Sequence, residues 1–268
     1  MANRAKKKSG ELFFLPTTRD ARRVDGCQKE LELAYRALKA CRSDSSVSRR
    51  DELDQCPATI RTTLRRLALL LGTSRLEKRR ILLLGDDDLL SVAIAATGLR
   101  TRVTVVDLDH SLLARIARWT KNEIVELVHH DLRLGLPGAM AASYDVVFTD
   151  PPYTAAGQLL FLRAGMMALR NTRSSSMFLC SSRLYLNPQQ MQRIITAAEQ
   201  AGLELVQIEQ DFNKYKAPPN VVDDIRRRKL QRDASYFYSS LLQFVPSGDR
   251  VSPESLPFLP SEIYQYEE

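Results

Sequence analysis

Histidine and cysteine are scarce in this 268-residue chain, and neither is spaced like a metal ligand set. The four cysteines are Cys27, Cys41, Cys56 and Cys180. They form no Cys-x-x-Cys pair, and the adjacent His129 and His130 have no suitably spaced acid or cysteine motif beside them. A zinc site needs about four such ligands at characteristic spacing, so no metal is expected. Reduced thiols in a cytoplasmic protein are the simplest interpretation of these cysteines.

Long apolar runs are missing as well. No stretch approaches about 18 consecutive apolar residues, so no membrane span is expected. Residues 1–10 are basic, but no apolar segment follows them, which argues against a secretory signal. Hydrophobic residues make up 44% of the chain, which is enough for a globular core.

The net positive charge is confined to the N-terminal part of the chain. The net charge is +7, and residues 1–75 hold 17 lysines and arginines against 9 acidic residues, whereas the remainder is nearly neutral. Residues 1–48 are expected to be a partly disordered basic extension with one helix at residues 28–41. Contact with nucleic acid is one hypothesis for this segment, and a solvated tail is the alternative.

Residues 81–91 carry the most informative pattern. Four apolar residues end at Gly85, three acids follow (Asp86, Asp87 and Asp88), and an apolar segment then leads to Gly98. This predicts a buried strand, a turn and a helix. Nucleotide-binding turns usually bring bare glycine backbone to a phosphate, which three carboxylates would repel. The turn therefore indicates a nucleoside ligand that carries a cation, with a solvated charge run as the alternative.

Further acids follow the next predicted strands. Asp107 ends the strand at residues 103–106, at a distance from Gly85 that suits a carboxylate on ribose hydroxyls. Asp131 follows the strand at residues 124–128, where an acid can reach an adenine amine. Asp150-Pro151-Pro152-Tyr153 follows the strand at residues 144–149. Its two prolines predict a rigid corner, and Asp150 can there accept a proton or hydrogen bond from an amine nucleophile.

The alternation continues to residue 245. Helices are expected at residues 155–170 and 188–201, strands at 176–181, 203–209 and 236–245, a loop at 211–219 and a basic helix-like segment at 224–231. Six to seven strands alternating with helices predict an α/β, doubly wound, Rossmann-like and mostly parallel sheet over residues 49–245. The proline-rich residues 246–268 are expected to wrap the surface or to be mobile.

Before this sheet, a helix is expected with Ile60, Leu64 and Leu67 on one face and arginines on the other. Asp54 and Gln55 precede it. They are either helix-entry residues or part of a lid over a ligand.

The chain resembles the branched-chain polyamine synthases in a combination of motifs. These are Asp54-Gln55…Thr59, Gly85-Asp86-Asp87-Asp88, Asp107, Asp131 and Asp150-Pro151-Pro152. Members of this family are also called N(4)-bis(aminopropyl)spermidine synthases. The resemblance covers about residues 47–245, and the Gly-Asp-Asp-Asp turn is its most specific element. It implies the fold of S-adenosylmethionine-dependent methyltransferases. It also implies transfer of aminopropyl groups from decarboxylated S-adenosylmethionine to the secondary amine of spermidine, with release of methylthioadenosine.

The resemblance also implies roles. The Gly85–Asp88 turn would hold the aminopropyl amine and orient the acceptor, and Asp87 or Asp88 would be the base for the attacking nitrogen. Asp107 would hold the ribose and Asp131 the adenine, while Asp54 and Gln55 would close over the donor. Asp150, Pro151, Pro152 and Tyr153 would line the acceptor side, with Asp150 acting beside the base. The donor is then a co-substrate, and no tightly bound cofactor is expected. The acidic turn would also repel the carboxylate of intact S-adenosylmethionine.

Two other functions stay open. The family often has an acid after Asp-Pro-Pro, whereas Tyr153 at this position is typical of methyltransferases that stack a flipped base. Methyl transfer from intact S-adenosylmethionine to an exocyclic amine of RNA or DNA is therefore the main alternative. A binding or regulatory module on the same fold is the third. A homodimer is also considered for this chain.

Overall fold

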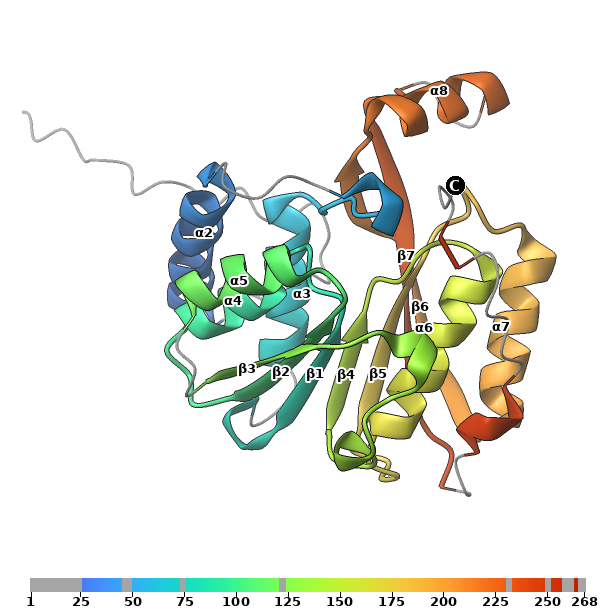
Figure 1. Cartoon of the computed structure of the whole chain (residues 1–268), viewed down its shortest axis with the longest axis horizontal. Helices are drawn as coiled ribbons and strands as arrows, with labels where there is room; N and C mark the ends of the chain where they lie inside the picture. Colours follow the sequence, from blue (N-terminus) through green and yellow to red (C-terminus); the bar gives the residue numbers. More distant parts are fainter. Residues whose placement is uncertain are drawn as a thin grey trace, which may run out of the picture.

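A single seven-stranded sheet organises the described part of the chain, in the order β3-β2-β1-β4-β5-β7-β6 (Figure 1). The computed structural model describes residues 26–44, 50–72, 76–120, 124–229, 233–248, 252–256 and 263–264. The strands are β1 (Arg80–Leu84), β2 (Arg102–Asp107), β3 (Val125–His129), β4 (Val146–Thr149), β5 (Ser176–Ser181), β6 (Leu203–Lys216) and β7 (Tyr236–Pro246). The first five pair in parallel, and β7 runs antiparallel between β5 and β6. The predicted doubly wound sheet is confirmed.

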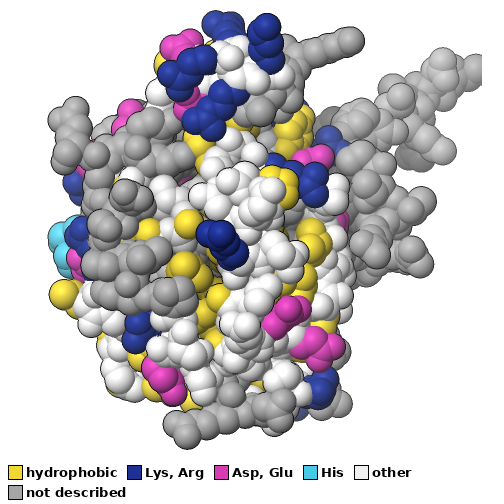
Figure 2. Space-filling view, turned by 90° about the vertical axis from the view of Figure 1, so that its right-hand side faces the viewer, with side chains coloured by type: hydrophobic (Ala, Val, Ile, Leu, Met, Phe, Trp, Pro, Cys, Tyr) yellow, Lys and Arg dark blue, Asp and Glu magenta, His cyan; other side chains and the backbone are white. Residues whose placement is uncertain are grey.

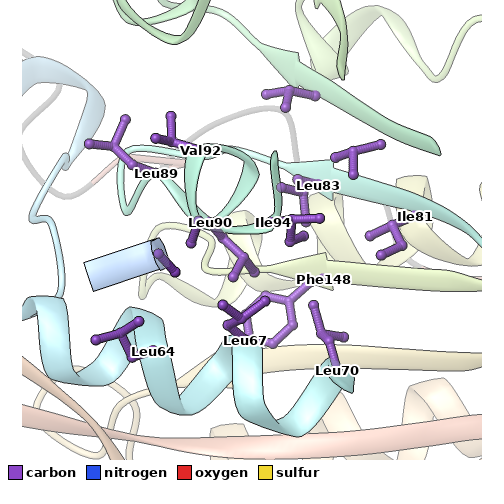
Figure 3. Packing of buried hydrophobic residues seen from close by; sticks show 14 of the residues in the cluster. Leu64, Leu67, Leu70, Ile81, Leu83, Leu89, Leu90, Val92, Ile94 and Phe148 are labelled. Atoms are coloured by element: carbon purple, nitrogen blue, oxygen red, sulfur yellow. The ribbon is translucent and has the colours of Figure 1, made fainter. Parts of the chain in front are cut away.

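Helices cover both faces of this sheet (Figure 1). They are α2 (Gln28–Ser43), α3 (Ile60–Gly72), α4 (Leu90–Ala96), α5 (His110–Trp119), α6 (Ala155–Ala168), α7 (Pro188–Gln200) and α8 (Pro219–Arg228). Because side chains alternate along a strand, Ile81 and Leu83 of β1 pack against α2 to α5, whereas Leu82 and Leu84 pack against α6 and α7. Figure 3 shows the first core, where Leu64, Leu67 and Leu70 of α3 lie close to Leu90, Ile94 and Phe148.

Three expectations need correction. The boundary at residue 48 does not separate α2 from the sheet, because Leu31 and Leu38 are fully buried in the first core. The loop expected at residues 211–219 is wrong, because β6 continues to Lys216 through an irregularity in its pairing with β7. In the chain after residue 246, Leu256 and Ile263 are buried in the second core rather than lying on the surface. The nucleic-acid contact assigned to the basic head falls largely on residues 1–25, which lie outside the described residues.

The extension of β6 has a structural consequence. It carries α8 beyond the body of the sheet, where α8 packs on the strand ends through Val221 and Ile225 (Figure 1). The helix ends in three arginines, Arg226, Arg227 and Arg228, which complement the negative end of the helix dipole. Lys and Arg side chains gather at this protruding end in Figure 2.

Gly157 of α6 fixes the distance between that helix and the Asp-Pro-Pro corner. A Cβ atom there would lie 2.8 Å from the carbonyl oxygen of Pro152 and 2.9 Å from that of Ile263. At Gly165 of the same helix, a Cβ would meet the terminal atoms of the flexible Met177 side chain. The backbone carbonyls near Gly157 cannot move away from an added Cβ, whereas the end of the Met177 side chain can change rotamer.

We therefore expect Gly157→Ala to lower the free energy of unfolding by about 1–3 kcal/mol, as overpacking does. Gly165→Ala is the matched control and should cost less, because Met177 can change rotamer and alanine favours the helix. Urea unfolding followed by circular dichroism measures both. Equal losses in the two variants would contradict the close backbone approach at Gly157.

Candidate active site

A cavity opens at the carboxyl edge of the parallel strands, where open α/β sheets bind ligands. Residues that follow β1, β2, β3 and β4 line it, together with the η1 segment (Asp51–Leu53) and residues of α6 and α8. The predicted residues that line it are Asp54, Gln55, Gly85, Asp86, Asp87, Asp107, Asp131, Asp150, Pro151, Pro152 and Tyr153. The structure thus brings together every predicted site residue except Asp88.

Asp86 stabilises the start of α4. Its carboxylate accepts the backbone N–H groups of Leu90, at 2.7 Å, and Ser91, at 3.1 Å, and also the Ser91 hydroxyl. Burial nevertheless raises the pKa of Asp86 to about 7. The side chain caps a helix, as an acid near a helix N-terminus commonly does.

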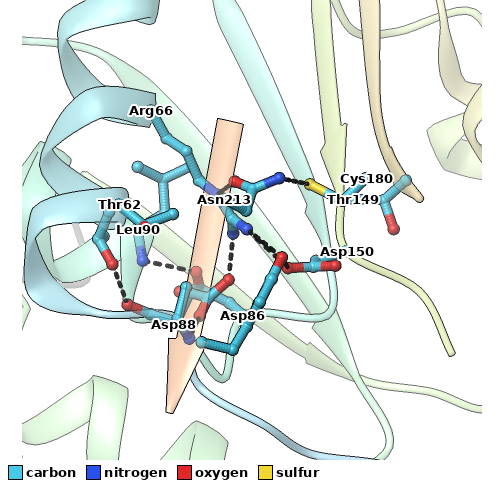
Figure 4. A network of polar contacts seen from close by, with 12 residues as sticks. Thr62, Arg66, Asp86, Asp88, Leu90, Thr149, Asp150, Cys180 and Asn213 are labelled. Carbon is cyan, nitrogen blue, oxygen red and sulfur yellow. Dashed lines mark hydrogen bonds and ion pairs between the residues drawn. The ribbon is translucent and has the colours of Figure 1, made fainter. Parts of the chain in front are cut away.

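Asp88 points away from the cavity. Its carboxylate forms a buried ion pair with Arg66 of α3 and accepts the backbone N–H of Ala58 (Figure 4). The expectation that Asp88 contacts the acceptor needs correction for this reason. A carboxylate with these fixed partners, which lies outside the cavity lining, is placed to orient the turn rather than to touch a ligand.

Asp87 alone of the three acids directs its carboxyl into the cavity without a fixed partner. Within the described ranges no hydrogen-bond donor contacts it, although Asp86 and Asp88 on either side have several. Burial, followed by the charges of Asp88, Asp150 and Asp107, raises the pKa of Asp87 well above its usual value. A carboxyl with a raised pKa in a ligand cavity is a candidate for proton transfer.

Asp107 and Asp131 lie at the ends of β2 and β3. Asp107 accepts the backbone N–H groups of Asp86, at 3.2 Å, and Asp109, at 2.8 Å, and burial raises its pKa to about 6. Asp131 pairs with Arg133 at 2.8 Å. Burial alone would raise the pKa of Asp131, but its hydrogen bonds with Arg133 lower it. A carboxylate has about four acceptor sites. Arg133 contacts both oxygens of Asp131 through its backbone N–H and its guanidinium, so a ligand amine would have to share or replace these contacts.

Asp54 and Gln55 follow η1 at the mouth of the cavity. Asp54 has a left-handed backbone, with φ of 53°, which reverses the chain after η1. The Gln55 amide donates to Asp109 at 2.9 Å and accepts the backbone N–H of Arg50 at 3.0 Å. This amide therefore ties the segment to the start of α5, and the role of the two residues as a lid over a donor stays a prediction.

Asp150 accepts hydrogen bonds on both carboxylate oxygens. Tyr153 donates to it at 2.7 Å, Tyr215 of β6 at 2.6 Å and Arg66 at 2.6 Å. Burial, and then the Asp150 charge, raise the pKa of both tyrosines well above the usual value, so they stay protonated donors. Asp150 is consequently an anchored acceptor rather than an isolated base.

Several site residues escaped prediction. The aromatic wall beside Tyr153 consists of Tyr185, Tyr215 and Phe237, with Tyr215 and Phe237 stacked at 4.6 Å between ring centroids. Tyr215 was missed because its segment was expected to be a loop. Arg66 was missed because it was placed on the polar face of its helix, where arginine is normally solvated. No local signal distinguishes a buried arginine from its exposed neighbours.

Fold and cavity together define a Rossmann-like protein of the methyltransferase structural class, with an acidic cavity at the carboxyl edge of the sheet. Residues 42–243 match the family model described as the branched-chain polyamine synthase A C-terminal domain. The chain belongs to this family.

Individual relatives agree. The N(4)-bis(aminopropyl)spermidine synthase of Thermococcus kodakarensis is 31% identical over 169 residues, which is 61% of this chain and 48% of that protein. The synthase of the same name from Thermus thermophilus is 40% identical over 120 residues, which is 44% of this chain and 35% of that protein. The chain therefore spans less than half the length of these curated relatives.

Solved structures give the same picture. The branched-chain polyamine synthase of Thermus thermophilus, in complex with N4-aminopropylspermidine and 5′-methylthioadenosine, matches with a TM-score of 0.70 and 25% identity. That match covers 86% of this chain and 70% of the other. A candidate RNA methyltransferase from Pyrococcus horikoshii matches with a TM-score of 0.58 and 14% identity, covering 82% of this chain and 98% of the other, which shows a shared fold only.

The raised pKa of Asp86 makes stability depend on pH. In the folded protein Asp86 keeps its proton up to about pH 7, whereas the unfolded chain loses it near pH 4. The folded state therefore binds more protons in this window, and the free energy of unfolding falls as pH rises through it. Three pKa units correspond to about 4 kcal/mol.

We expect Asp86→Asn to lose less stability than the wild type between pH 5 and 8, because asparagine cannot ionise. Urea unfolding at several pH values provides the measurement. Asp223→Asn, on the exposed face of α8, is the control and should follow the wild-type curve. A decline in Asp86→Asn as steep as in the wild type would show that Asp86 does not carry this effect.

Proposed function

We propose that this chain transfers an aminopropyl group from decarboxylated S-adenosylmethionine to the secondary amine of a polyamine such as spermidine, releasing methylthioadenosine. The observation that carries the proposal is the Gly85–Asp88 turn. It presents Asp87, whose carboxyl has no hydrogen-bond donor among the described residues, to an acidic cavity at the carboxyl edge of the sheet, where open α/β folds bind ligands. Family membership and the two ligands in the Thermus thermophilus structure support the same chemistry.

The donor fits the side of the cavity that β1, β2 and β3 form. We assign Asp107 to the ribose hydroxyls and Asp131 to the adenine amine. Leu108 and Leu132 line the same part of the cavity and supply apolar surface that supports a place for the base there. The aminopropyl ammonium of the donor is attracted by Asp87. A donor that kept the carboxylate of S-adenosylmethionine would instead place that carboxylate against an acidic turn, which disfavours its binding.

The acceptor fits the opposite side, between the Asp-Pro-Pro corner and α8. Asp150 supplies an anchored negative charge, and Tyr153, Tyr185 and Phe237 supply aromatic faces. Aromatic faces and carboxylates together attract alkylammonium groups while accommodating their methylene chains. A polyamine has this alternation of cations and methylene segments.

The chemical step is a displacement at carbon. The lone pair of the acceptor nitrogen attacks the aminopropyl carbon bound to the sulfonium, so that a carbon–nitrogen bond forms. The carbon–sulfur bond breaks, and its electron pair returns to sulfur as a neutral thioether. A secondary amine is mostly protonated at neutral pH, so one proton must leave it, and the Asp87 carboxylate is placed to accept that proton. The donor is a co-substrate in this scheme, and no tightly bound cofactor is required.

Other expectations remain predictions. They are the cytoplasmic location, the homodimer and the nucleic-acid contact of the basic head. In the part of the chain that the structure describes, no helix is long and apolar enough to cross a membrane.

A paired end-point assay tests the function. Purified protein is incubated with decarboxylated S-adenosylmethionine and spermidine, and separately with intact S-adenosylmethionine and mixed RNA and DNA. Mass spectrometry should detect spermidine heavier by one or two aminopropyl units, with methylthioadenosine, in the first reaction. Methylated nucleic acid in the second reaction alone would favour the methyltransferase alternative and overturn the proposal.

Asp87→Asn should lower kcat for this transfer by about 100- to 1,000-fold, the usual contribution of a positioned general base. Since an elevated pKa delays ionisation, the wild-type kcat should rise with pH around a midpoint well above pH 4. This rise of kcat with pH should disappear in the variant, and any rise that remains would reflect deprotonation of the substrate amine. Asp131→Asn gives a contrast, because it should mainly raise KM for the donor. A normal kcat in Asp87→Asn would exclude this residue as the base.

A further inference from the structure

Arg66 is the most completely buried cation in the described part of the chain, with a relative exposure of 1%. It lies on α3, and its guanidinium reaches four side chains (Figure 4). Nη1 contacts Asp88, and Nη2 donates to Asp150 at 2.6 Å and to the Tyr215 hydroxyl at 3.1 Å. Nε donates to Asn213 at 2.9 Å.

These contacts join segments that are far apart in the sequence. Asp88 belongs to the turn after β1, Asp150 to the turn after β4, and both Asn213 and Tyr215 to β6. One guanidinium from α3 therefore connects the donor turn, the acceptor corner and the edge of the sheet. The planar fork of arginine can serve several acceptors at once, whereas a lysine ammonium is a point charge.

The arrangement keeps Arg66 charged. Burial alone would lower the pKa of Arg66, but the neighbouring carboxylates, Asp88 foremost, raise it above its already high usual value. A buried cation bound to two anions leaves one net negative charge at this junction. That excess charge lies beside the cavity, where a cationic substrate would enter.

The charge also acts on Asp87. This carboxyl is surrounded by like charges: Asp88 in its own turn, Asp107 at the end of β2 and Asp150 in the turn after β4. All three disfavour the ionisation of Asp87. The opposing cations are Arg66 from α3 and Arg42 from α2, whose guanidinium lies near the same turn. Without Arg66, only Arg42 of these two cations would remain to offset the negative charges that disfavour ionisation of Asp87.

We propose that Arg66 is a positioning residue for the transfer reaction, fixing Asp150 as a hydrogen-bond acceptor for the substrate amine and supplying the positive charge that lets Asp87 take the proton as a carboxylate. The inference rests on the proposed aminopropyl transfer and extends it to a residue outside the cavity lining. Arg66 acts through Asp150 and Asp87, and it touches neither substrate.

The neighbouring Arg65 provides a matched control. It lies on the same helix, donates to Glu209 at 3.4 Å and stacks on Phe212 of β6 at 4.3 Å. It thus ties α3 to β6 as Arg66 does, whereas the ion pairs with Asp88 and Asp150 in the two acidic turns are made by Arg66. Loss of Arg65 should change stability without changing the ionisation of the site.

The experiment compares Arg66→Met, Arg66→Lys and Arg65→Met in the full chain, by the pH profile of kcat for aminopropyl transfer to spermidine. Arg66→Met should lower kcat by about 10- to 100-fold, because Asp150 loses the charged one of its three hydrogen-bond donors and keeps only Tyr153 and Tyr215. It should also shift the rise of kcat with pH on the acidic side of the profile (the acidic limb) about one pH unit higher. Removing a cation makes Asp87 harder to ionise. Arg66→Lys should lower kcat while leaving the limb near its wild-type position, because the charge is kept. Arg65→Met should leave both unchanged.

Circular dichroism melting establishes that each variant is folded. If Arg66→Met alone does not fold, Arg66→Met combined with Asp88→Asn removes one buried charge of each sign, and it is compared with Asp88→Asn alone. The acidic limb of the double variant should lie at higher pH than that of Asp88→Asn, because only the loss of the Arg66 cation separates the two. A folded Arg66 variant with the kcat and limb of Arg65→Met would overturn the inference. A wild-type protein without aminopropyl transfer would instead contradict the proposed function, so the two failures are distinguishable.

Discussion

One buried guanidinium organises the functional edge of this protein. Arg66 binds the carboxylates of Asp88 and Asp150, which lie on turns after two different parallel strands, and it also bonds Asn213 and Tyr215 of β6. A charge withdrawn this far from water is tolerated only when anions and acceptors surround it. The pairing therefore constrains both turns, and the relative position of the Gly85–Asp88 turn and the Asp-Pro-Pro corner in the cavity depends on it.

Three consecutive acids have three different environments because of this constraint. Asp86 caps α4, Asp88 pairs with Arg66, and Asp87 between them faces the cavity. Asp86 and Asp88 thus hold the turn in place, and Asp87 lines the cavity among several other negative charges. The same composition serves both architecture and chemistry, and only the partners of each carboxylate distinguish the two uses.

The aromatic side of the cavity depends on β6, a strand that sequence periodicity predicted only in part. The alternation of β6 was predicted only to residue 209, because its pairing with β7 becomes irregular there and its remaining residues include aromatics followed by two prolines. The strand nevertheless continues, carrying Tyr215 to Asp150 and placing α8 over the cavity. Likewise, α2 was predicted as a helix, but its burial in the first core depends on apolar surface that α3 and α4 provide. Propensity and periodicity are local, whereas these outcomes depend on distant partners.

The sequence by itself determined the strand and helix alternation, the acids at the strand ends and their convergence on one edge. Parallel strands linked by helices bring all their carboxyl ends to the same side, so the approximate site follows from order along the chain. Only the tertiary structure decided which acid faces the ligand, since that depends on whether an arginine or a helix terminus reaches the carboxylate first. Arg65 and Arg66 are identical in type and adjacent in sequence, and both contact β6, yet Arg66 also forms the ion pairs with Asp88 and Asp150 at the site. Their separation arises from the angle between successive residues on a helix that is packed against a particular neighbour.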